Sequence, residues 1–161
     1  MATFDCRPLL MIFLLLQLIS PAALAEADSP LSDQYFRDLV ATRYVEPFRL
    51  GNVELWIQAF DENAIALHNH RPADRGRVAI EKFGRAVHDN LSLAEYDVEV
   101  TDIRRSDQWV YTVGTYSSRF VSKSDGSEPF GRTNGKFVLL WELQDDQQWR
   151  IILDMGNSNK H

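Results

Sequence analysis

The sequence of 161 residues is poor in cysteine, with Cys6 as its single thiol. Cys6 lies in an N-terminal segment that we expect to be removed, so the mature chain would contain no disulfide, no cysteine-ligated zinc and no cysteine nucleophile. Export without disulfides is typical of a bacterial periplasm or exterior, because a domain with a full-sized core does not need covalent cross-links. The sequence therefore predicts a periplasmic or secreted protein.

The N-terminal segment has the features of a signal peptide. Arg7 is the single basic residue of a short leading region, and the apolar run from Leu9 to Ile19 is interrupted only by Gln17. Ala23 and Ala25 place small residues at the two positions that a signal peptidase reads. The run is shorter than the roughly 20 apolar residues of a membrane-spanning helix. We predict a signal peptide over residues 1–25, cleaved near Ala25, with an uncleaved anchor as the alternative, and a single domain over residues 26–161.

Positive charge is also scarce. Lysine and arginine number 17 against 23 acidic residues, which gives a net charge of −6, and Arg104 and Arg105 form the only adjacent basic pair. An acidic chain without a basic stripe does not fit the surface of a protein that binds nucleic acid or anionic membranes. We therefore expect neither nucleic acid nor, after cleavage of the signal peptide, a membrane as a partner.

Motifs of cofactor and metal chemistry are missing as well. The sequence contains no glycine-rich phosphate loop, no nucleotide-binding fingerprint and no serine–histidine–aspartate set. His68 and His70 would share one face of a strand, but a catalytic zinc needs three protein ligands, and Asp74 is the only acidic residue nearby in sequence. Two exposed histidines at a strand end explain the pair as well, so we predict no metal and no cofactor.

Apolar residues recur at helical spacing over the first half of the mature chain. Ser29 is a candidate N-cap before Pro30, and Pro47 is expected to kink or end the first helix before Gly51. Asn52 opens a second helix, and a third helix starts at residues 75–77. The apolar faces of the three helices consist of Phe36, Val40, Tyr44 and Phe48, of Val53, Trp56, Ile57 and Phe60, and of Ile80, Phe83 and Val87.

From Leu93 onwards the pattern changes to the period of two that is typical of β-strands. In a long strand near residues 109–120, Trp109 and Tyr111 fall on one face and Val110 and Thr112 on the other. Residues 137–143 are apolar at nearly every position, which predicts a central strand, and residues 149–155 form the last strand. Helices followed by a strongly bent antiparallel sheet indicate an α+β fold.

Several of these segments, taken in order, resemble one family. The segments are Arg43-Tyr44-Val45-Glu46, Gly51-Asn52-Val53-Glu54, residues 60–64, residues 75–80 and Trp149-Arg150-Ile151. Together they resemble the SnoaL-like branch of the nuclear transport factor two-like superfamily, over nearly the whole mature chain. The resemblance implies N-terminal helices packed in a strongly curved antiparallel sheet, which form a cone with an apolar pocket, usually in a dimer. It does not imply one activity, because this fold hosts isomerases, cyclases, dehydratases, binding modules and assembly domains.

Residues 43–68 are also similar, without a gap, to the ketosteroid isomerases of this superfamily. Tyr44 falls where those enzymes have the tyrosine that donates to the developing enolate oxygen, and His68 falls where they have the aspartate that moves the proton. The position of a second, oxyanion-stabilising aspartate falls at or beside Leu139, in an apolar strand. The resemblance therefore implies a site at Tyr44 and His68 with one partner missing and a changed base, which disfavours steroid isomerisation.

The residues themselves leave the role of this pair open. Burial would keep the His68 imidazole neutral, and a neutral imidazole could remove a proton next to a carbonyl while Tyr44 stabilises the oxyanion. Tyr44 shares the apolar stripe of the first helix, so it could equally line a pocket without chemistry or be an ordinary core residue. Either face of the last strand could look into the cone. Asp154 is therefore a spare acid, for which we expect packing on the outer face or in an interface.

The aromatic residues are more numerous than a domain of this size needs, and some should line the pocket. We predict that the lining residues are Trp56, Phe60, Phe83, Tyr111, Phe137 and Trp141. Our first hypothesis is an exported protein that binds a small, largely apolar molecule in its cone and forms a homodimer through the sheet. The alternatives are an isomerase, dehydratase or cyclase that uses His68 as base and Tyr44 as oxyanion donor, and a dimeric interaction module without a ligand.

Overall fold

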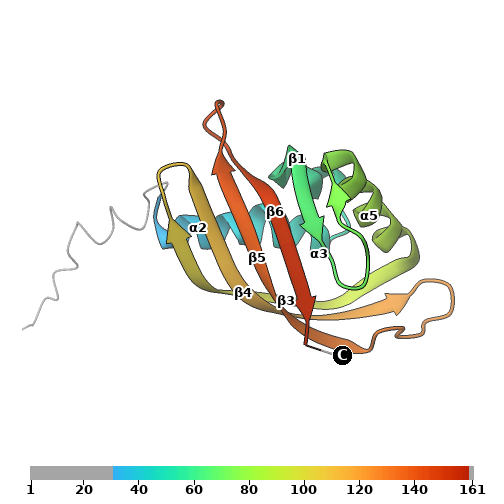
Figure 1. Cartoon of the computed structure of the whole chain (residues 1–161). Coiled ribbons are helices and arrows are strands. Elements are labelled where there is room, and N and C mark those ends of the chain that lie inside the picture. The colour runs from blue at the N-terminus through green and yellow to red at the C-terminus, as the bar shows by residue number, and fades with distance from the viewer. Residues whose placement is uncertain (1–30, 160–161) are drawn as a thin grey trace, which may run out of the picture.

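The computed structural model describes residues 31–159, so the predicted signal peptide and the expected cap at Ser29 lie outside the described residues. Within them, helical segments come first and most of the sheet follows, as the α+β prediction states. Figure 1 shows helices α2 (Asp33–Leu39) and α3 (Glu46–Arg49) crossing behind the strands of a curled sheet, with α5 (Arg77–Asn90) near one edge of the sheet. In the described part of the chain, no helix is long and apolar enough to cross a membrane.

The N-terminal helix is continuous but changes its winding. It consists of the α-helix α2 (Asp33–Leu39), the π-helix η1 (Val40–Val45) and the α-helix α3 (Glu46–Arg49). Ser32 caps its start, because the Ser32 Oγ accepts a hydrogen bond from the Tyr35 N–H at 3.0 Å. A four-residue spacing drifts around an α-helix, whose turn takes about 3.6 residues. The wider π-helical turn offsets this drift and keeps the stripe that leads to Tyr44 on one face.

Pro47 neither breaks the helix nor ends it at once. The π-helical turn precedes it, with the Glu46 N–H donating to the carbonyl of Ala41, and the helix continues to Arg49. Because proline lacks an N–H, a wider turn at this point costs the helix little. Gly51 then ends the helix in the left-handed conformation, with φ of 71°.

The second helix is short. Asn52 caps it through its side-chain oxygen, which accepts from the Leu55 N–H at 3.0 Å. The α-helix α4 (Val53–Trp56) continues as the 3-10 helix η2 (Ile57–Ala59) and leads directly into strand β1 (Phe60–Leu67). The third predicted helix is α5 (Arg77–Asn90), which follows the two-residue strand β2 (Asp74–Arg75). The Arg77 guanidinium holds α5 to the sheet by donating to the Phe60 carbonyl at 2.6 and 3.0 Å.

The six strands form one sheet in the order β2-β1-β6-β5-β4-β3. Its long strands are β3 (Leu91–Arg105), β4 (Trp109–Ser122), β5 (Arg132–Leu143) and β6 (Trp149–Ser158). All pairs are antiparallel except β1 with β6, which run parallel. This one parallel pair differs from the expected antiparallel pattern, and the long stretch of chain between β1 and β6 permits it, because parallel strands cannot be joined by a hairpin.

Strand β6 contains a β-bulge that decides which of its side chains face inward. Trp141 of β5 pairs with Ile151 and the preceding Leu140 pairs with Leu153, so Ile152 has no partner on β5. In an unbroken strand, the alternation that buries Ile151 would turn Leu153 inward and Asp154 outward. The bulge shifts this alternation by one residue, and Asp154 is buried on the concave side at 2% exposure.

The core lies between the helices and the concave face of the sheet. Its largest fully buried side chains include Phe36 and Trp56 from the helices and Phe60 and Trp141 from the strands. The buried Trp141 indole donates to the Thr112 hydroxyl at 3.3 Å, so its polar atom is satisfied within the core. The core fills one end of the cone, where side chains of the helices meet side chains of β1, β3, β4, β5 and β6, and leaves the other end hollow.

Candidate functional site

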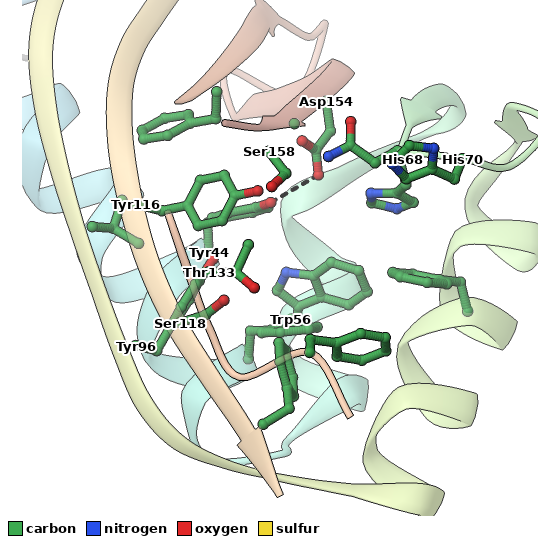
Figure 2. Close-up of a pocket in the computed structure, with 18 residues that line it drawn as sticks. Tyr44, Trp56, His68, His70, Tyr96, Tyr116, Ser118, Thr133, Asp154 and Ser158 are labelled. Carbon is green, nitrogen blue, oxygen red and sulfur yellow. Dashed lines mark hydrogen bonds between the residues drawn. The ribbon is translucent and has the colours of Figure 1, made fainter. Parts of the chain in front are cut away.

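The hollow end of the cone holds a cavity of about 520 Å³, which we call the cone cavity. This volume is within the range of roughly 300–1,000 Å³ that is usual for sites of small organic ligands. Half of its 18 lining residues are phenylalanine, tyrosine or tryptophan. These aromatic residues come from the helices, from strands β3, β4 and β5 and, for Phe130, from the segment between β4 and β5, and Figure 2 shows the lining residues around a common space. The walls therefore suit a flat or bulky apolar molecule.

A pair of polar side chains, the buried Asp154 and the half-buried Tyr44, lies on the wall of the cone cavity. The Tyr44 hydroxyl, from the π-helix η1, donates to the Asp154 Oδ2, from strand β6, at 2.8 Å (Figure 2). The bulge at Ile152 turns Asp154 towards the helix, and the π-helical turn holds Tyr44 opposite it. Two irregular elements thus bring together groups that are far apart in sequence.

Burial controls the protonation of this pair. It raises the pKa of Asp154 to about 6, while the hydrogen bond from Tyr44 acts in the opposite direction. Burial, and then the negative charge of Asp154, raises the pKa of Tyr44 well above its usual value. The same two causes raise the pKa of Tyr96 and Tyr116, which also line the cavity. At neutral pH the cavity therefore contains neutral tyrosines and a largely ionised carboxylate.

His68 lies on the same cavity wall, directly after strand β1. Its ring stacks on Phe83 of α5, with ring centroids 4.2 Å apart and planes at 26°, and Arg71 lies over the same Phe83 ring at 4.5 Å. Burial lowers the pKa of His68, an effect that Asp74 partly opposes and Arg71 reinforces. The Nε2 atom is buried and has no hydrogen-bond partner among the described residues. His68 is therefore a neutral imidazole at neutral pH.

The structure brings both predicted catalytic residues, Tyr44 and His68, to the same cavity, but it gives Tyr44 a different partner. The Tyr44 hydroxyl donates to Asp154, and no hydrogen bond joins it to His68 among the described residues. Leu139, near which the missing aspartate was expected, is fully buried and is the cross-strand neighbour of Asp154. A carboxyl group is thus present beside the expected position, but it is that of Asp154 on β6, the strand next to β5.

Three of the six predicted lining residues border the cavity, and three do not. Trp56, Phe83 and Phe137 are on its wall. Phe60 and Trp141 are fully buried in the core behind it, because both point into the filled end of the cone. Tyr111 is 40% exposed on the outer face, since Val110 and Thr112 take the inward positions of β4. These last three assignments are therefore corrected.

Asp154 is the main site residue that sequence reasoning misplaced. The expectation of outer-face packing is wrong, because the bulge in β6 reverses the alternation on which it depended. Tyr96 and Tyr116 were not singled out either. Tyr116 could have been found, since it shares the inward face of β4 with Val110 and Thr112.

The described residues offer no metal centre. Among residues 31–159, no group of three or more histidine, cysteine, aspartate or glutamate side chains lies close enough together to hold a metal ion. His68 and His70 both border the cone cavity, but Asp74 accepts a hydrogen bond from Arg71 at 2.8 Å. The site can therefore bind an apolar molecule, hold one polar group at Asp154, and exchange a proton through Asp154 or His68.

Comparisons with known proteins support the fold. No protein-family model matches the sequence, and no curated protein matches it. Among solved structures, a ketosteroid isomerase-like protein from Erwinia carotovora atroseptica has a TM-score of 0.69 at 13% identity, over 77% of this chain and 94% of that one. A nuclear transport factor 2-like superfamily protein from Salmonella enterica serovar Typhimurium has a TM-score of 0.67 at 16% identity, over 80% of this chain and 91% of that one. A conserved protein from Planctomyces limnophilus has a TM-score of 0.68 at 13% identity, over 78% and 97%.

These likenesses show that the chain has the cone-shaped α+β fold of the nuclear transport factor two-like superfamily, as the sequence resemblance implied. At this level of identity they establish the fold, and the chemistry has to be argued from the site itself.

Proposed function

We propose that this protein binds a small, largely apolar molecule in the cone cavity, with one polar group of the molecule directed to the Tyr44–Asp154 pair. The observation that carries this proposal is a cavity of about 520 Å³ with half of its lining residues aromatic and the hydrogen-bonded Tyr44–Asp154 pair on one side. Such a combination of apolar walls and few polar groups is the usual design of a small-molecule site. A dimeric interaction module without a ligand would not need this hollow.

The test uses naphthalenemethanol, a neutral bicyclic compound with one hydroxyl group. At a concentration about 100-fold above its Kd, a ligand stabilises the folded state by about 2.7 kcal/mol. We therefore expect the melting temperature to rise by roughly 8 °C or more, measured by differential scanning fluorimetry and checked by calorimetry.

A matched pair of variants on strand β6 locates the binding site. Gly156 borders the cone cavity, and a Cβ atom placed there meets no heavy atom within 4 Å. Gly156→Leu should therefore fill part of the cavity, keep the fold and abolish the ligand-induced shift. Met155→Leu changes the neighbouring residue on the outer face and should leave the shift intact. A full shift in Gly156→Leu, or no shift with naphthalenemethanol or smaller aromatic alcohols in the unmodified protein, would contradict the proposal.

A second candidate is catalysis of proton transfer, as in an isomerase, dehydratase or cyclase. It is favoured by His68, which borders the cone cavity and whose pKa is lowered by burial, so that its imidazole is a neutral base. In this reaction His68 would take a proton from the carbon next to a ketone carbonyl, the C–H electron pair would form the enolate, and Tyr44 would turn its hydroxyl to the enolate oxygen. Return of the proton to the same or another carbon would complete the step.

Proton exchange into a bicyclic ketone tests this second candidate without knowledge of the natural substrate. With tetralone in D2O, deuterium incorporation next to the carbonyl, followed by NMR, should be faster with the protein than with buffer. His68→Ala should lose this acceleration, and Lys82→Ala, at an exposed position of α5 that does not line the cone cavity, should keep it. Equal rates in the unmodified protein and His68→Ala would exclude His68 as the base.

We also propose that the protein acts after export. The support is the sequence of residues 1–25, with its apolar run and the small residues Ala23 and Ala25. Expression of the full chain in a bacterial host should yield a periplasmic product that begins at Glu26, as determined by intact mass. A cytoplasmic product of full length would contradict this proposal.

A further inference from the structure

The charge of the cone cavity is unbalanced. Asp154 is the only acidic residue among the described lining residues, and neither lysine nor arginine is among them. No ion pair involving Asp154 occurs within residues 31–159, and the influences on its protonation are burial and the Tyr44 hydroxyl. A buried carboxylate is costly to ionise unless a positive charge or several hydrogen bonds compensate it. Within residues 31–159, Asp154 receives one hydrogen bond and has no lysine or arginine beside it in the cavity lining.

One oxygen of this carboxylate is available to a ligand. Oδ2 accepts the hydrogen bond from Tyr44, and no donor among the described residues reaches Oδ1. The raised pKa of Tyr44 keeps its hydroxyl protonated, so Tyr44 stays a donor to Oδ2. Because the pKa of Asp154 is about 6, the carboxylate is mostly ionised at neutral pH and can accept a further hydrogen bond at Oδ1.

The aromatic walls next to Asp154 also favour a positive charge. Tyr44, Tyr96 and Tyr116 lie within the electrostatic reach of Asp154, whose charge contributes to the raised pKa of each. Trp56 borders the same cavity and lies beside Tyr44, with ring centroids 6.2 Å apart. The faces of tyrosine and tryptophan rings attract cations, and the attraction is strongest where water is excluded. A ligand with a neutral hydroxyl group would gain only the hydrogen bond to Oδ1, because it carries no positive charge for the aromatic rings to attract.

We propose that the ligand of the cone cavity is an amphipathic amine, with its protonated nitrogen at Asp154 Oδ1 and its apolar ring against the aromatic walls. This inference rests on the proposed binding function and specifies its ligand class. The ammonium group would donate to Oδ1 and balance the buried charge, and the remaining N–H groups would face the tyrosine hydroxyls. A carboxylate ligand would be repelled by the same charge.

Three compounds with one ring system and different polar groups test this inference. Naphthalenemethylamine, naphthalenemethanol and naphthoic acid are compared at neutral pH by isothermal titration calorimetry on the unmodified protein. The amine should bind about tenfold more tightly than the alcohol or better, because hydrogen bonds to charged groups contribute more than neutral ones. The acid should bind most weakly.

A charge-matched pair of variants assigns the preference to Asp154. Asp154→Asn is isosteric and should bring the amine and the alcohol to the same Kd within about twofold. Asp97→Asn removes one exposed carboxylate from β3 and should keep the tenfold preference. The inference is overturned if the alcohol binds the unmodified protein as tightly as the amine, or if Asp154→Asn keeps the preference. Binding of the alcohol alone would leave the proposed function standing, whereas no binding of any compound would remove both.

Discussion

A single carboxylate sets the polarity of the cone cavity. Asp154 is 2% exposed, and its only hydrogen-bond donor in the described chain is the Tyr44 hydroxyl. Ionisation of this group in the folded protein is therefore unfavourable relative to the unfolded chain, where water surrounds it. A residue that reduces stability at neutral pH and yet borders an apolar cavity is typical of functional sites, where perturbed pKa values concentrate.

This raised pKa predicts how stability depends on pH. Burial moves the folded-state pKa of Asp154 from the ordinary 3.8 to about 6, so the folded protein binds the proton more tightly than the unfolded chain. Stability from this group is present below pH 4 and is lost as the pH rises through 6, by an amount on the order of 3 kcal/mol. Asp154→Asn should remove this loss, so its advantage over the unmodified protein should grow between pH 4 and 6 in urea unfolding experiments.

Other carboxylates act in the opposite direction, but they are common to both proteins and cancel in the difference. These are carboxylates at the surface whose pKa is lowered by hydrogen-bonding partners, namely Glu46, Glu95, Asp125 and Asp146. Asp97→Asn is the control, and its unfolding free energy should stay within about 0.5 kcal/mol of the unmodified protein. A pH-independent difference between Asp154→Asn and the unmodified protein would show that Asp154 is not buried in a cavity of low polarity.

At the scale of elements, helix α5 approaches helix α4 through a glycine. A Cβ atom at Gly84 would lie 2.7 Å from Trp56 Cζ3 and 3.3 Å from Val53 Cγ1. Trp56 also borders the cone cavity, so this helix contact holds part of the cavity wall in place. The absence of a side chain at Gly84 thus affects both packing and site geometry.

Gly84→Ala should be destabilising even though alanine is the better helix former. The gain in helix propensity is about 1 kcal/mol, while overpacking of a buried contact costs about 1–3 kcal/mol. We expect a net loss of about 1 kcal/mol in urea unfolding, together with weaker binding of naphthalenemethanol, because Trp56 has to move. Ala86→Gly, on the exposed side of the same helix, should lose about 1 kcal/mol without any change in ligand binding. An increase in stability for Gly84→Ala would contradict the close approach.

The sequence predicts elements of this fold better than it predicts the irregular points within them. Three helices, the long strands and the α+β order follow from apolar spacing, capping residues and turn signals. The bulge at Ile152 and the π-helical turn at Tyr44 depend on tertiary contacts, and no local pattern marks them. The Tyr44–Asp154 pair depends on both irregularities, so it could not be derived from spacing. Tyr44 and His68 were identified as site residues only through the family resemblance. Such a resemblance indicates which positions face the site, but it does not say which side chains hydrogen-bond to each other there.

At the scale of the whole molecule, the outer face of the sheet carries continuous apolar rows. Cross-strand partners from β1, β6, β5 and β4 form two rows on this face, Ile65, Leu153, Leu140 and Tyr111, and then Leu67, Met155, Val138 and Val113. Tyr111 is 40% and Met155 41% exposed. The helices occupy the opposite side of these strands (Figure 1). An exposed apolar surface of this kind is typical of a protein interface.

We propose that this face forms the homodimer interface, and a charge at its centre tests it. The unmodified protein should elute as a dimer in size-exclusion chromatography with light scattering at micromolar concentrations. Tyr111→Lys should shift it to a monomer, because an unpaired charge in the centre of an apolar interface is costly. Ser92→Lys adds the same charge at an exposed position of the edge strand β3 and should leave the dimer intact. A monomeric unmodified protein would rule out this interface.

The unpaired Ile152 has a consequence for the alignment of this chain with other proteins of its fold. A protein whose last strand runs without the extra residue would need one position fewer to present an acid opposite Leu139. A gap-free match of the two strands would then pair Asp154 with a side chain that points to solvent. An alignment based on superposed backbones, with a gap allowed at residue 152, would align Asp154 with the equivalent acidic residue of such a protein.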